Sequence, residues 1–537
     1  MIRRLFGFVS RVTREDHGFT LVPVLTASLV LGMFSAAAWA AANGDIPLAR
    51  NDQDRKSALE AADAGVQWYT HQLEQSTNFW ATCAPSTQGV QLQGTRSSWR
   101  SIGVNNESFA VEVMRAPGKT CNADKLDSTL LNNGTLQIRV TGRYSSGKKV
   151  VQRQQMASFR RDGFLDFVWY TKRETAPPAS YNGTKLDPTV IATNCDKVRA
   201  LRVNGNDTSD ATHPQCSIID FWTGDNIHGP MHTEDDSFSV QGTPIFGRDA
   251  DDKIEVSGAG ATTTTMYSAH GSASVDTEGT KVAPGKTIDP PKDNGALRNF
   301  ADVIPAGNTC IQLVDGGMYV SDKLTSWGGT INCPDKTGTY RALTDDTVVY
   351  VDNNTTCTNG YQKFQQYPKD TCGNVAVWGT YSTNITIGSA NDVIVYKSLT
   401  RKAGSDALLG LVANQFVRVY HPIKYNGAST CDYSTDNYYA TPPVTEIDAA
   451  ILATQGSFLN DNWFCGDPEN KLTIKGTIAQ YWRGAVGYTT GSNRSGYDKD
   501  YWYDDRLKYR QPPQFLDAAT SQWHILRQTE QSPVASG

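Results

Sequence analysis

The stretch Phe19-Thr20-Leu21-Val22-Pro23-Val24-Leu25 opens an apolar segment that carries no charge until Asp45. A basic leader precedes it, and positive charge ahead of an apolar run keeps that end of a chain in the cytoplasm. Residues 19–43 are long enough to span a bilayer as a helix, since about 20 residues suffice. We therefore expect an export signal, with the remainder of the chain outside the cytoplasm. The positive residues of the leader are Arg3, Arg4, Arg11 and Arg14.

Two kinds of processing fit this segment. The small residues from Ala36 to Ala42 fit cleavage of an ordinary secretory signal near Ala42. Gly18 followed by Phe19-Thr20-Leu21-Val22 instead resembles the processing site of type IV prepilins, in which the leader is cut on the cytoplasmic side and the apolar segment is retained. The resemblance implies cleavage between Gly18 and Phe19 by a prepilin peptidase, methylation of the processed chain, and a membrane anchor over residues 19–43.

A second helical pattern follows the apolar segment. Between Asp52 and Leu73, apolar residues recur at spacings of three and four, which draws one stripe along a helix. The block Ala58-Leu59-Glu60-Ala61-Ala62-Asp63-Ala64-Gly65-Val66 resembles PilX-type minor pilins. Because Asn43, Gly44 and Pro47 lie between the two stretches, we expect a kink or a local melt there. The stripe consists of Leu59, Ala62, Val66, Tyr69 and Leu73.

Position 23 departs from the pilin pattern. Major pilins carry a glutamate as the fifth residue of the processed chain, which is thought to neutralise the N-terminal amine of a neighbouring subunit. Here that residue is Pro23. An unpaired charge in the apolar centre of a filament is costly, so a chain without the carboxylate fits poorly in mid-filament. The resemblance therefore implies a subunit at a tip, in an initiating complex, or held in the membrane.

Composition limits the remaining function classes. The chain has 537 residues and a formal net charge of -5, with basic and acidic residues interspersed. This length leaves room for two or three domains after the anchor, and the charge gives no basic surface for nucleic acid. All ten cysteines follow the apolar segment, so an exported chain is expected to form disulfides. Their connectivity stays open, but consecutive pairing would link Cys83 with Cys121, Cys195 with Cys216, Cys310 with Cys333, Cys357 with Cys372, and Cys431 with Cys465.

The region after Phe79 is expected to be β-rich. Short alternating runs separated by turn residues dominate, and a hairpin is predicted with its turn at Ser145-Ser146-Gly147. This hairpin needs a partner face, which the upstream amphipathic helix supplies, so residues 79–165 should form a small antiparallel sheet packed on the helix. The expected divisions are a leader over 1–18, a helix over 19–78, this sheet over 79–165, and a β-rich ectodomain over 166–537.

The ectodomain repeats a short unit of apolar residues closed by glycine. Irregular repetition of such units favours the rungs of a parallel β-solenoid, in which Val and Ile stack inward and Gly forms corners. A β-sandwich is the alternative, although its strands would be longer and joined by evenly spaced hairpins. Examples of the unit are Ile227-His228-Gly229, Val375-Ala376-Val377-Trp378-Gly379, Ile385-Thr386-Ile387-Gly388 and Leu472-Thr473-Ile474-Lys475-Gly476.

A second resemblance covers nearly the whole chain. Several stretches are similar to those of a family of large bacterial proteins that have a prepilin-like N-terminus and no assigned activity. This resemblance implies architecture and location, and it names no chemistry. The stretches are Phe164-Leu165-Asp166-Phe167, 225–233, 448–453, 476–480, 496–501 and 512–516.

Candidate sites are few. His228 and His232 would share the face of an extended strand and could meet Asp235 at a metal ion, although the Gly-Pro between them favours a structural role. The cluster Arg248-Asp249-Ala250-Asp251-Asp252 would suit Ca²⁺ or acid/base chemistry, but a solvated loop is the simpler interpretation. Tyr481-Trp482-Arg483 and Tyr501-Trp502-Tyr503 would suit stacking on sugars if exposed, although such residues more often fill cores or edges.

No Gly-x-Ser-x-Gly elbow, phosphate-binding loop, His-Glu-x-x-His helix or Cys-x-x-Cys motif occurs in the sequence. We therefore expect a non-enzymatic surface subunit of a type IV pilus-type assembly, without a metal or other cofactor. Its expected partners are other pilin subunits, the prepilin peptidase and the cytoplasmic membrane. The alternatives are a surface-anchored carbohydrate-binding adhesin and a β-solenoid enzyme acting on polysaccharides, so a surface glycan is a further candidate partner.

Overall fold

A computed structural model of the chain describes most of the residues beyond the leader. The processing site Gly18-Phe19 and the cysteines Cys83, Cys121, Cys216 and Cys431 lie outside the described residues. The described residues are 21–76, 79, 90–92, 99–103, 106–114, 135–147, 149–177, 195–196, 217–270, 276–322, 325–327, 330–357, 371–422, 443–466, 468–490, 493–519 and 521–531.

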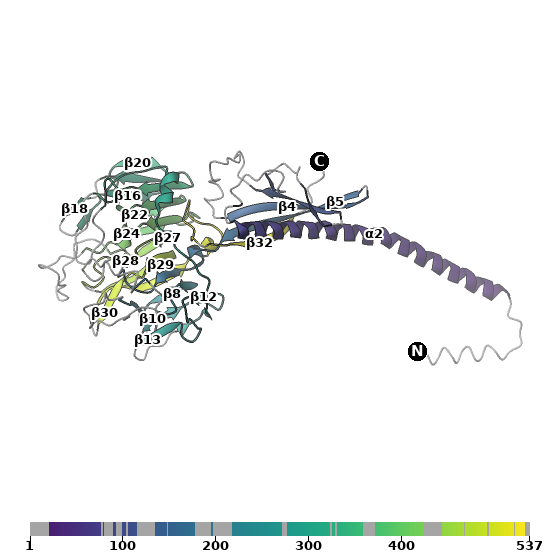
Figure 1. Ribbon diagram of the computed structural model, residues 1–537, viewed down its shortest axis with the longest axis horizontal. Helices are drawn as coiled ribbons and strands as arrows, with labels where there is room; N and C mark the ends of the chain where they lie inside the picture. Colours follow the sequence, from purple (N-terminus) through teal and green to yellow (C-terminus); the bar gives the residue numbers. More distant parts are fainter. Residues whose placement is uncertain are drawn as a thin grey trace.

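One long helix, α2 (Leu21–Gln75), forms the stalk seen in Figure 1. The local melt expected around Asn43 and Gly44 is not formed, because the helix continues through Pro47. A proline within a helix removes one backbone hydrogen bond and crowds the preceding turn, which bends a helix without necessarily ending it. The stretch just before Pro47, Asn43-Gly44-Asp45, has low helix propensity, yet the helix continues through it.

The second half of α2 packs on a small sheet. The strands are ordered β1-β3-β4-β5-β32, and β2 pairs with β3. Its core joins the helix residues Val66 and Tyr69 to Ile138, Val140 and Phe159 of the sheet, so the amphipathic stripe and the predicted hairpin are confirmed. The strands are β1 (Val90–Leu92), β2 (Arg100–Ile102), β3 (Glu107–Val113), β4 (Thr135–Ser146), β5 (Lys149–Arg161) and β32 (Trp523–Gln531).

The last strand of the chain lies in this first sheet. β32 pairs antiparallel with β5, and Trp523 is opposite Arg161. The small sheet therefore extends beyond the range 79–165 expected from the sequence and takes an edge strand from the C-terminus. The reason is topological: everything between Arg161 and Trp523 is inserted between two neighbouring strands of one sheet.

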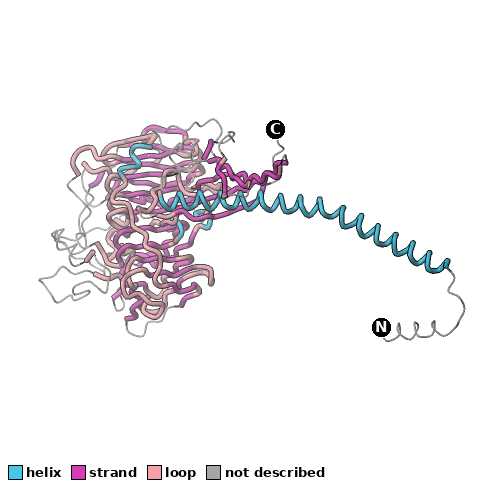
Figure 2. The backbone as a smooth tube through the Cα atoms, turned by 45° about the vertical axis from the view of Figure 1, so that its right-hand side comes forward, coloured by secondary structure: helices cyan, strands magenta, loops and turns pink. Residues whose placement is uncertain are grey.

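The inserted part is a stack of short parallel strands (Figure 2), and the strand pairings divide the stack into three faces. The long strands bend at a corner, so that β22, β24, β27 and β29 each contribute to two faces. We call the faces 1, 2 and 3 and one turn through them a rung. Face 1 contains β14 (Asp276–Thr277), β11 (Ile245–Phe246), β8 (Asn226–His228), β31 (Asn493–Tyr503) and parts of β29 (Pro468–Trp482), β27 (Glu446–Ala453), β24 (Val393–Arg401) and β22 (Val375–Tyr381).

Faces 2 and 3 complete each rung. Face 2 contains β15 (Thr280–Val282), β12 (Lys253–Val256), β9 (Met231–Thr233), β6 (Trp169–Arg173), the remaining parts of β29 and β27, β25 (Leu409–Ala413), β23 (Ile385–Ser389) and β21 (Thr347–Val351). Face 3 contains β13 (Tyr267–His270), β10 (Phe238–Gln241) and β7 (Asp220–Phe221), and separately β28 (Phe458–Asn460), β26 (Val417–Val419), the remaining parts of β24 and β22, and β16 (Thr309–Val314).

Short elements complete the insert. β16 also pairs with an antiparallel neighbour, β17 (Gly317–Ser321), which pairs in turn with β20 (Thr339–Ala342). The remaining elements are the hairpin β18 (Thr325–Trp327) and β19 (Thr330–Asn332), β30 (Gly487–Thr490), and the 3-10 turns η3 (Phe164–Asp166), η5 (Gly295–Phe300) and η6 (Asp505–Lys508).

Parallel pairing identifies the insert as a solenoid rather than a sandwich, because a sandwich is built from antiparallel strands. The apolar residues of the repeated units lie in register from rung to rung: Val375 pairs with Val393, and Val393 pairs with Val417. Their side chains are buried in one continuous core. The expected fold class, mainly β with one long N-terminal helix, a small antiparallel sheet and a solenoid-like ectodomain, is confirmed.

The chain does not wind through the solenoid from one end to the other. It joins the stack in the middle at β6, winds through β7 to β15 to one end, and then runs back along face 2. Winding resumes at the opposite end with β16 and returns to the middle at β31, which pairs with β8. The return segment, residues 283–308, bonds to successive rungs through Gly285 N to Val256 O (2.8 Å) and Asp302 N to Val348 O (2.8 Å).

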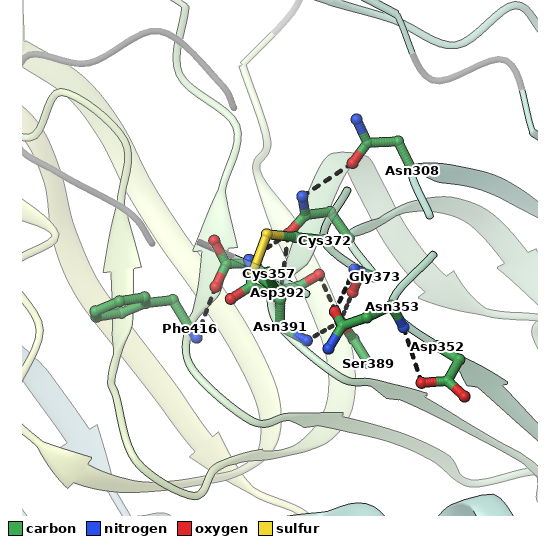
Figure 3. Close-up of a disulfide and its surroundings, with 11 residues drawn as sticks. Asn308, Asp352, Asn353, Cys357, Cys372, Gly373, Ser389, Asn391, Asp392 and Phe416 are labelled. Atoms are coloured by element: carbon green, nitrogen blue, oxygen red, sulfur yellow. Dashed lines mark hydrogen bonds between the residues drawn. A yellow bond between two sulfur atoms is a disulfide. The ribbon is translucent and has the colours of Figure 1, made fainter. Parts of the chain in front are cut away.

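Polar side chains are stacked at the corner that precedes face 3, next to a disulfide (Figure 3). The Asn374 amide donates to Asn308 Oδ1 at 2.9 Å, and the Asn391 amide donates to Asn374 Oδ1 at 2.6 Å. The three asparagines belong to successive rungs, so each of these buried side-chain amides finds a hydrogen-bond partner in the neighbouring rung. Disulfides join Cys357 to Cys372 and Cys310 to Cys333, which are two of the consecutive pairs considered from the sequence. Cys195 and Cys465 are also disulfide-bonded.

Candidate functional site

The first functional feature is the exposed apolar end of α2. Residues Leu21–Ala40 have a mean hydropathy of 2.0 and none of the segment is buried. By length and composition this helix can cross a membrane, and a signal sequence would meet the same criterion. Pro23 lies in the first described turn, where its carbonyl accepts a hydrogen bond from the Thr26 hydroxyl at 3.0 Å. The described part of the chain is thus an apolar helix joined to a folded ectodomain.

The second feature is the close contact between that helix and the small sheet. A Cβ atom at Gly142 would lie 2.0 Å from the carbonyl oxygen of Ala58 and 2.3 Å from the amide nitrogen of Ala62. Only glycine lets the β4 backbone approach the helix this closely. The Ala-rich block of the helix and Gly142 therefore form one close contact between small residues.

The histidines considered as metal ligands lie on different faces. Gly229 adopts φ 154° and, with Pro230, forms the corner between β8 and β9, so His228 lies on face 1 and His232 on face 2. His228 stacks on Trp502 with ring centroids 3.8 Å apart, and its Nε2 is 3.6 Å from Asp500 Oδ1. The structure therefore does not bring the two imidazoles together. Asp235 instead accepts a hydrogen bond from the backbone N–H of Glu174 at 2.7 Å.

His232 lies fully buried between two glutamates. Its Nδ1 is 2.9 Å from Glu255 and its Nε2 is 3.0 Å from Glu234. Burial lowers the pKa of His232, but the hydrogen bonds to both carboxylates outweigh it and raise the pKa above its ordinary value. Glu234 also accepts a hydrogen bond from the backbone N–H of Ile288 in the return segment. The imidazole thus ties the return segment to face 2.

The acidic cluster forms a structural ion pair. The Arg248 guanidinium donates to both oxygens of Asp252, each at 2.9 Å, and also to Asp505 of η6. Hydrogen bonds to these carboxylates, Asp252 first, raise the pKa of Arg248, and burial opposes them. In the part of the chain that the structure describes, no group of three or more His, Cys, Asp or Glu side chains has the arrangement of a metal site.

Alternation along the strand explains which aromatic residues are accessible. In β31, Tyr501 and Tyr503 point inward and are buried, whereas Trp502 points outward and is 42% exposed. Trp482 and Arg483 are buried as well, and the Arg483 guanidinium pairs with Glu174 at 2.7 Å. Most of the aromatic residues considered from the sequence as sugar-stacking candidates are therefore core residues.

Sequence reasoning missed a carboxylate pair on the outer side of face 1. Glu446 and Asp448 alternate along β27, and Lys475 of the next strand donates to Glu446. Burial raises the pKa of Asp448, and the nearby Glu446 raises it further. The Arg401 backbone N–H donates to Asp448 at 3.0 Å. The alternation Glu446-Ile447-Asp448 was the available signal, because it places both carboxylates on one face.

The sequence reasoning also missed a cavity of about 380 Å³ at the middle of the solenoid. Its wall includes the half-buried aromatic side chains of Trp222, Trp463 and Tyr488, with Trp463 and Tyr488 edge to face at 5.7 Å between centroids. These residues come from three separate segments of the chain. No local pattern links them, so the cavity could not be found from the sequence.

Charged residues lie at the base and rim of this cavity. Lys499 Nζ donates to Asp225 Oδ2 at 2.6 Å, and both side chains are buried. Burial lowers the pKa of Lys499, and Asp225 opposes part of this effect. The backbone N–H groups of Trp222 and Lys499 also donate to Asp225, at 2.9 and 3.0 Å. At the rim, Arg494 pairs with Asp498, and both are partly exposed.

No family model matches the chain, and no curated protein matches its sequence. Among solved structures, the chain is similar to the competence-associated pilin ComZ from Thermus thermophilus, with 13% identity and a TM-score of 0.32. The alignment covers 89% of this chain and 97% of ComZ. At this identity and TM-score, a shared fold with ComZ is not shown.

Proposed function

We propose that the chain is a non-enzymatic minor pilin or pseudopilin-like subunit of a type IV pilus-type assembly. The observation that supports this most is the helix α2: its first part is apolar, uncharged and exposed, and its second part packs on a small antiparallel sheet. An apolar helix needs either lipid or the helices of neighbouring subunits around it. Other pilin subunits are thus the partners proposed for this segment, with the prepilin peptidase acting before assembly.

Within such an assembly, we place the subunit at the tip, in the initiating complex, or in the membrane. Two features favour these positions over the shaft. Pro23 stands where a shaft subunit would supply a carboxylate to its neighbour. The solenoid lies beyond the small sheet, at the end of the molecule opposite the start of α2 (Figure 1). A head of this size is accommodated most easily where no further subunit follows. The PilX-like block of the helix is consistent with a minor subunit.

Mass spectrometry of the mature N-terminus tests the proposal. We expect a chain that begins at Phe19, and a Gly18→Ala variant that keeps its leader, because the resemblance to prepilins implies that glycine itself stands before the cut. A mature chain beginning after Ala40 or Ala42 would show ordinary signal cleavage and would remove the anchor on which the proposal depends. Ala37→Val serves as the matched control, since it alters a small residue far from the proposed cut.

A further inference from the structure

The cavity lies where the two halves of the solenoid meet. Faces 1 and 2 are continuous across this junction, since β31 pairs with β8 and β29 pairs with β6. Face 3 is interrupted there: within the described residues, β7 ends one ladder and β28 ends the other. Next to β28, the Ala485 carbonyl accepts a hydrogen bond from the Asn460 N–H at 3.0 Å. In the space from there to β7, the described residues form no strand of face 3. The cavity lies at this gap between the described strands of face 3.

The walls of the cavity combine flat apolar surfaces with hydrogen-bonding groups. Trp222 and Tyr488 are half-buried, so part of each ring lies at the surface. The Trp463 ring packs edge to face against Phe464 and Tyr488, with centroids 5.2 and 5.7 Å away, and its backbone carbonyl accepts a hydrogen bond from the Ser495 hydroxyl at 2.9 Å. Rigid aromatic side chains provide contact area at a low entropic cost, and their faces attract the C–H groups of a ligand.

The charges of the cavity disfavour an anion. Carboxylates in the lining belong to Asp220, Asp225 and Asp498, against the cations of Arg494 and Lys499. Asp225 and Lys499 neutralise each other at the base, and the Arg494–Asp498 pair at the rim is partly exposed. A ligand with many hydroxyl groups can both donate to the Asp498 carboxylate and accept from the Arg494 guanidinium.

We propose that this cavity binds a neutral sugar residue of a glycan. A sugar ring presents a C–H face to aromatic side chains and hydroxyl groups at its edge, which matches the division of the cavity into an aromatic wall and a polar rim. The volume of about 380 Å³ falls within the range of about 300–1,000 Å³ usual for small-molecule sites. The site does not depend on the proposed pilin role, since every residue used here belongs to the solenoid.

Binding is tested on the full-length protein in detergent. A glycan array is followed by calorimetry with maltotriose, triacetylchitotriose and lactose, and with the anionic trigalacturonate. We expect a neutral saccharide to bind, and Trp222→Ala to weaken that binding about tenfold or more through loss of the stacking surface. Asp498→Asn keeps the shape of the rim and should weaken binding by removing the charged acceptor.

Trp502→Ala is the matched control, because it removes an exposed tryptophan on face 1 outside the cavity. If Trp222→Ala fails to fold, Tyr488→Ala replaces it as the test of the aromatic wall. The proposal is overturned if no neutral saccharide binds up to about 10 mM, if only the anionic saccharide binds, or if Trp502→Ala abolishes binding that the cavity variants leave intact. Processing at Gly18 is measured on the same preparations, so the failure of either proposal is distinguishable from the other.

Discussion

The disulfide Cys357–Cys372 allows a quantitative prediction about the solenoid. The bond closes a loop with a sequence separation of 15, and Cys310–Cys333 closes one with a separation of 23. In the chain-entropy description, loops of these lengths correspond to about 3.0 and about 3.4 kcal/mol of stabilisation through the unfolded state. Together they approach the whole stability of an ordinary domain, which is about 5–15 kcal/mol.

We expect Cys357→Ala/Cys372→Ala to lower the free energy of unfolding of the detergent-solubilised protein by about 3 kcal/mol. The measurement is urea denaturation followed by tryptophan fluorescence, with m-values compared between variants. Cys310→Ala/Cys333→Ala is the companion variant and should lose somewhat more, because both of its sulfurs are buried in an aromatic cluster and their packing is lost as well. Free energies within about 0.5 kcal/mol of wild type for both double variants would refute the reasoning and show that the rungs alone hold these loops.

Three further results are expected. Gly142→Ala should lower stability by about 1–3 kcal/mol, measured by thermal denaturation, because its new Cβ would force the helix away from β4; an unchanged melting temperature would contradict the close contact. The pKa of His232 is raised in the folded state, so the contribution of its protonated form to the free energy of unfolding is complete below about pH 6.5 and is lost as pH rises through the folded-state pKa. His232→Gln should therefore flatten the dependence of the free energy of unfolding on pH above about 6.5. A dependence parallel to that of wild type would argue against this role. Pro23→Glu should bring no gain in assembly, because it places an acidic side chain in the bilayer at an insertion cost of about 2.5–3.5 kcal/mol. Immunogold labelling of filaments checks the position of the subunit. Labels along the length of wild-type filaments would overturn the tip position.

Local features of the fold could be predicted from the sequence. The helix stripe through Val66 and Tyr69 and the hairpin at Gly147 each depend on residues close together in the chain, where periodicity and turn chemistry carry the information. The repeated units of Val and Ile closed by glycine also indicated parallel rungs. A kink or a local melt was expected before Pro47, and the melt is not formed, because a single proline removes only one backbone hydrogen bond while the neighbouring turns keep theirs.

Pairings between distant segments could not be predicted. β32 joins β5, and β31 joins β8, yet strands of a few residues carry no signal that identifies a partner hundreds of positions away. The same limit applies to the cavity, because Trp222 and Tyr488 line it together only in the folded solenoid, where distant segments of the chain lie side by side. The metal-site alternative for His228 and His232 assumed one continuous strand, because residues four apart share a face only while the strand continues, and Gly229 ends it.

The position of the solenoid within the small sheet has a mechanical consequence. The chain crosses between the two parts twice, after β5 and before β32, and these strands are hydrogen-bonded neighbours. A pull on α2 reaches the solenoid through both crossings at once, at β6 and β31, which pair with β29 on the same side, β31 on face 1 and β6 on face 2. Tension is therefore shared by two covalent connections and spreads through the strands hydrogen-bonded to β6 and β31, which are β29, β8, β9 and β30. The outermost rungs at either end lie off this load path, so they are free to vary in length and sequence without weakening the link between head and stalk.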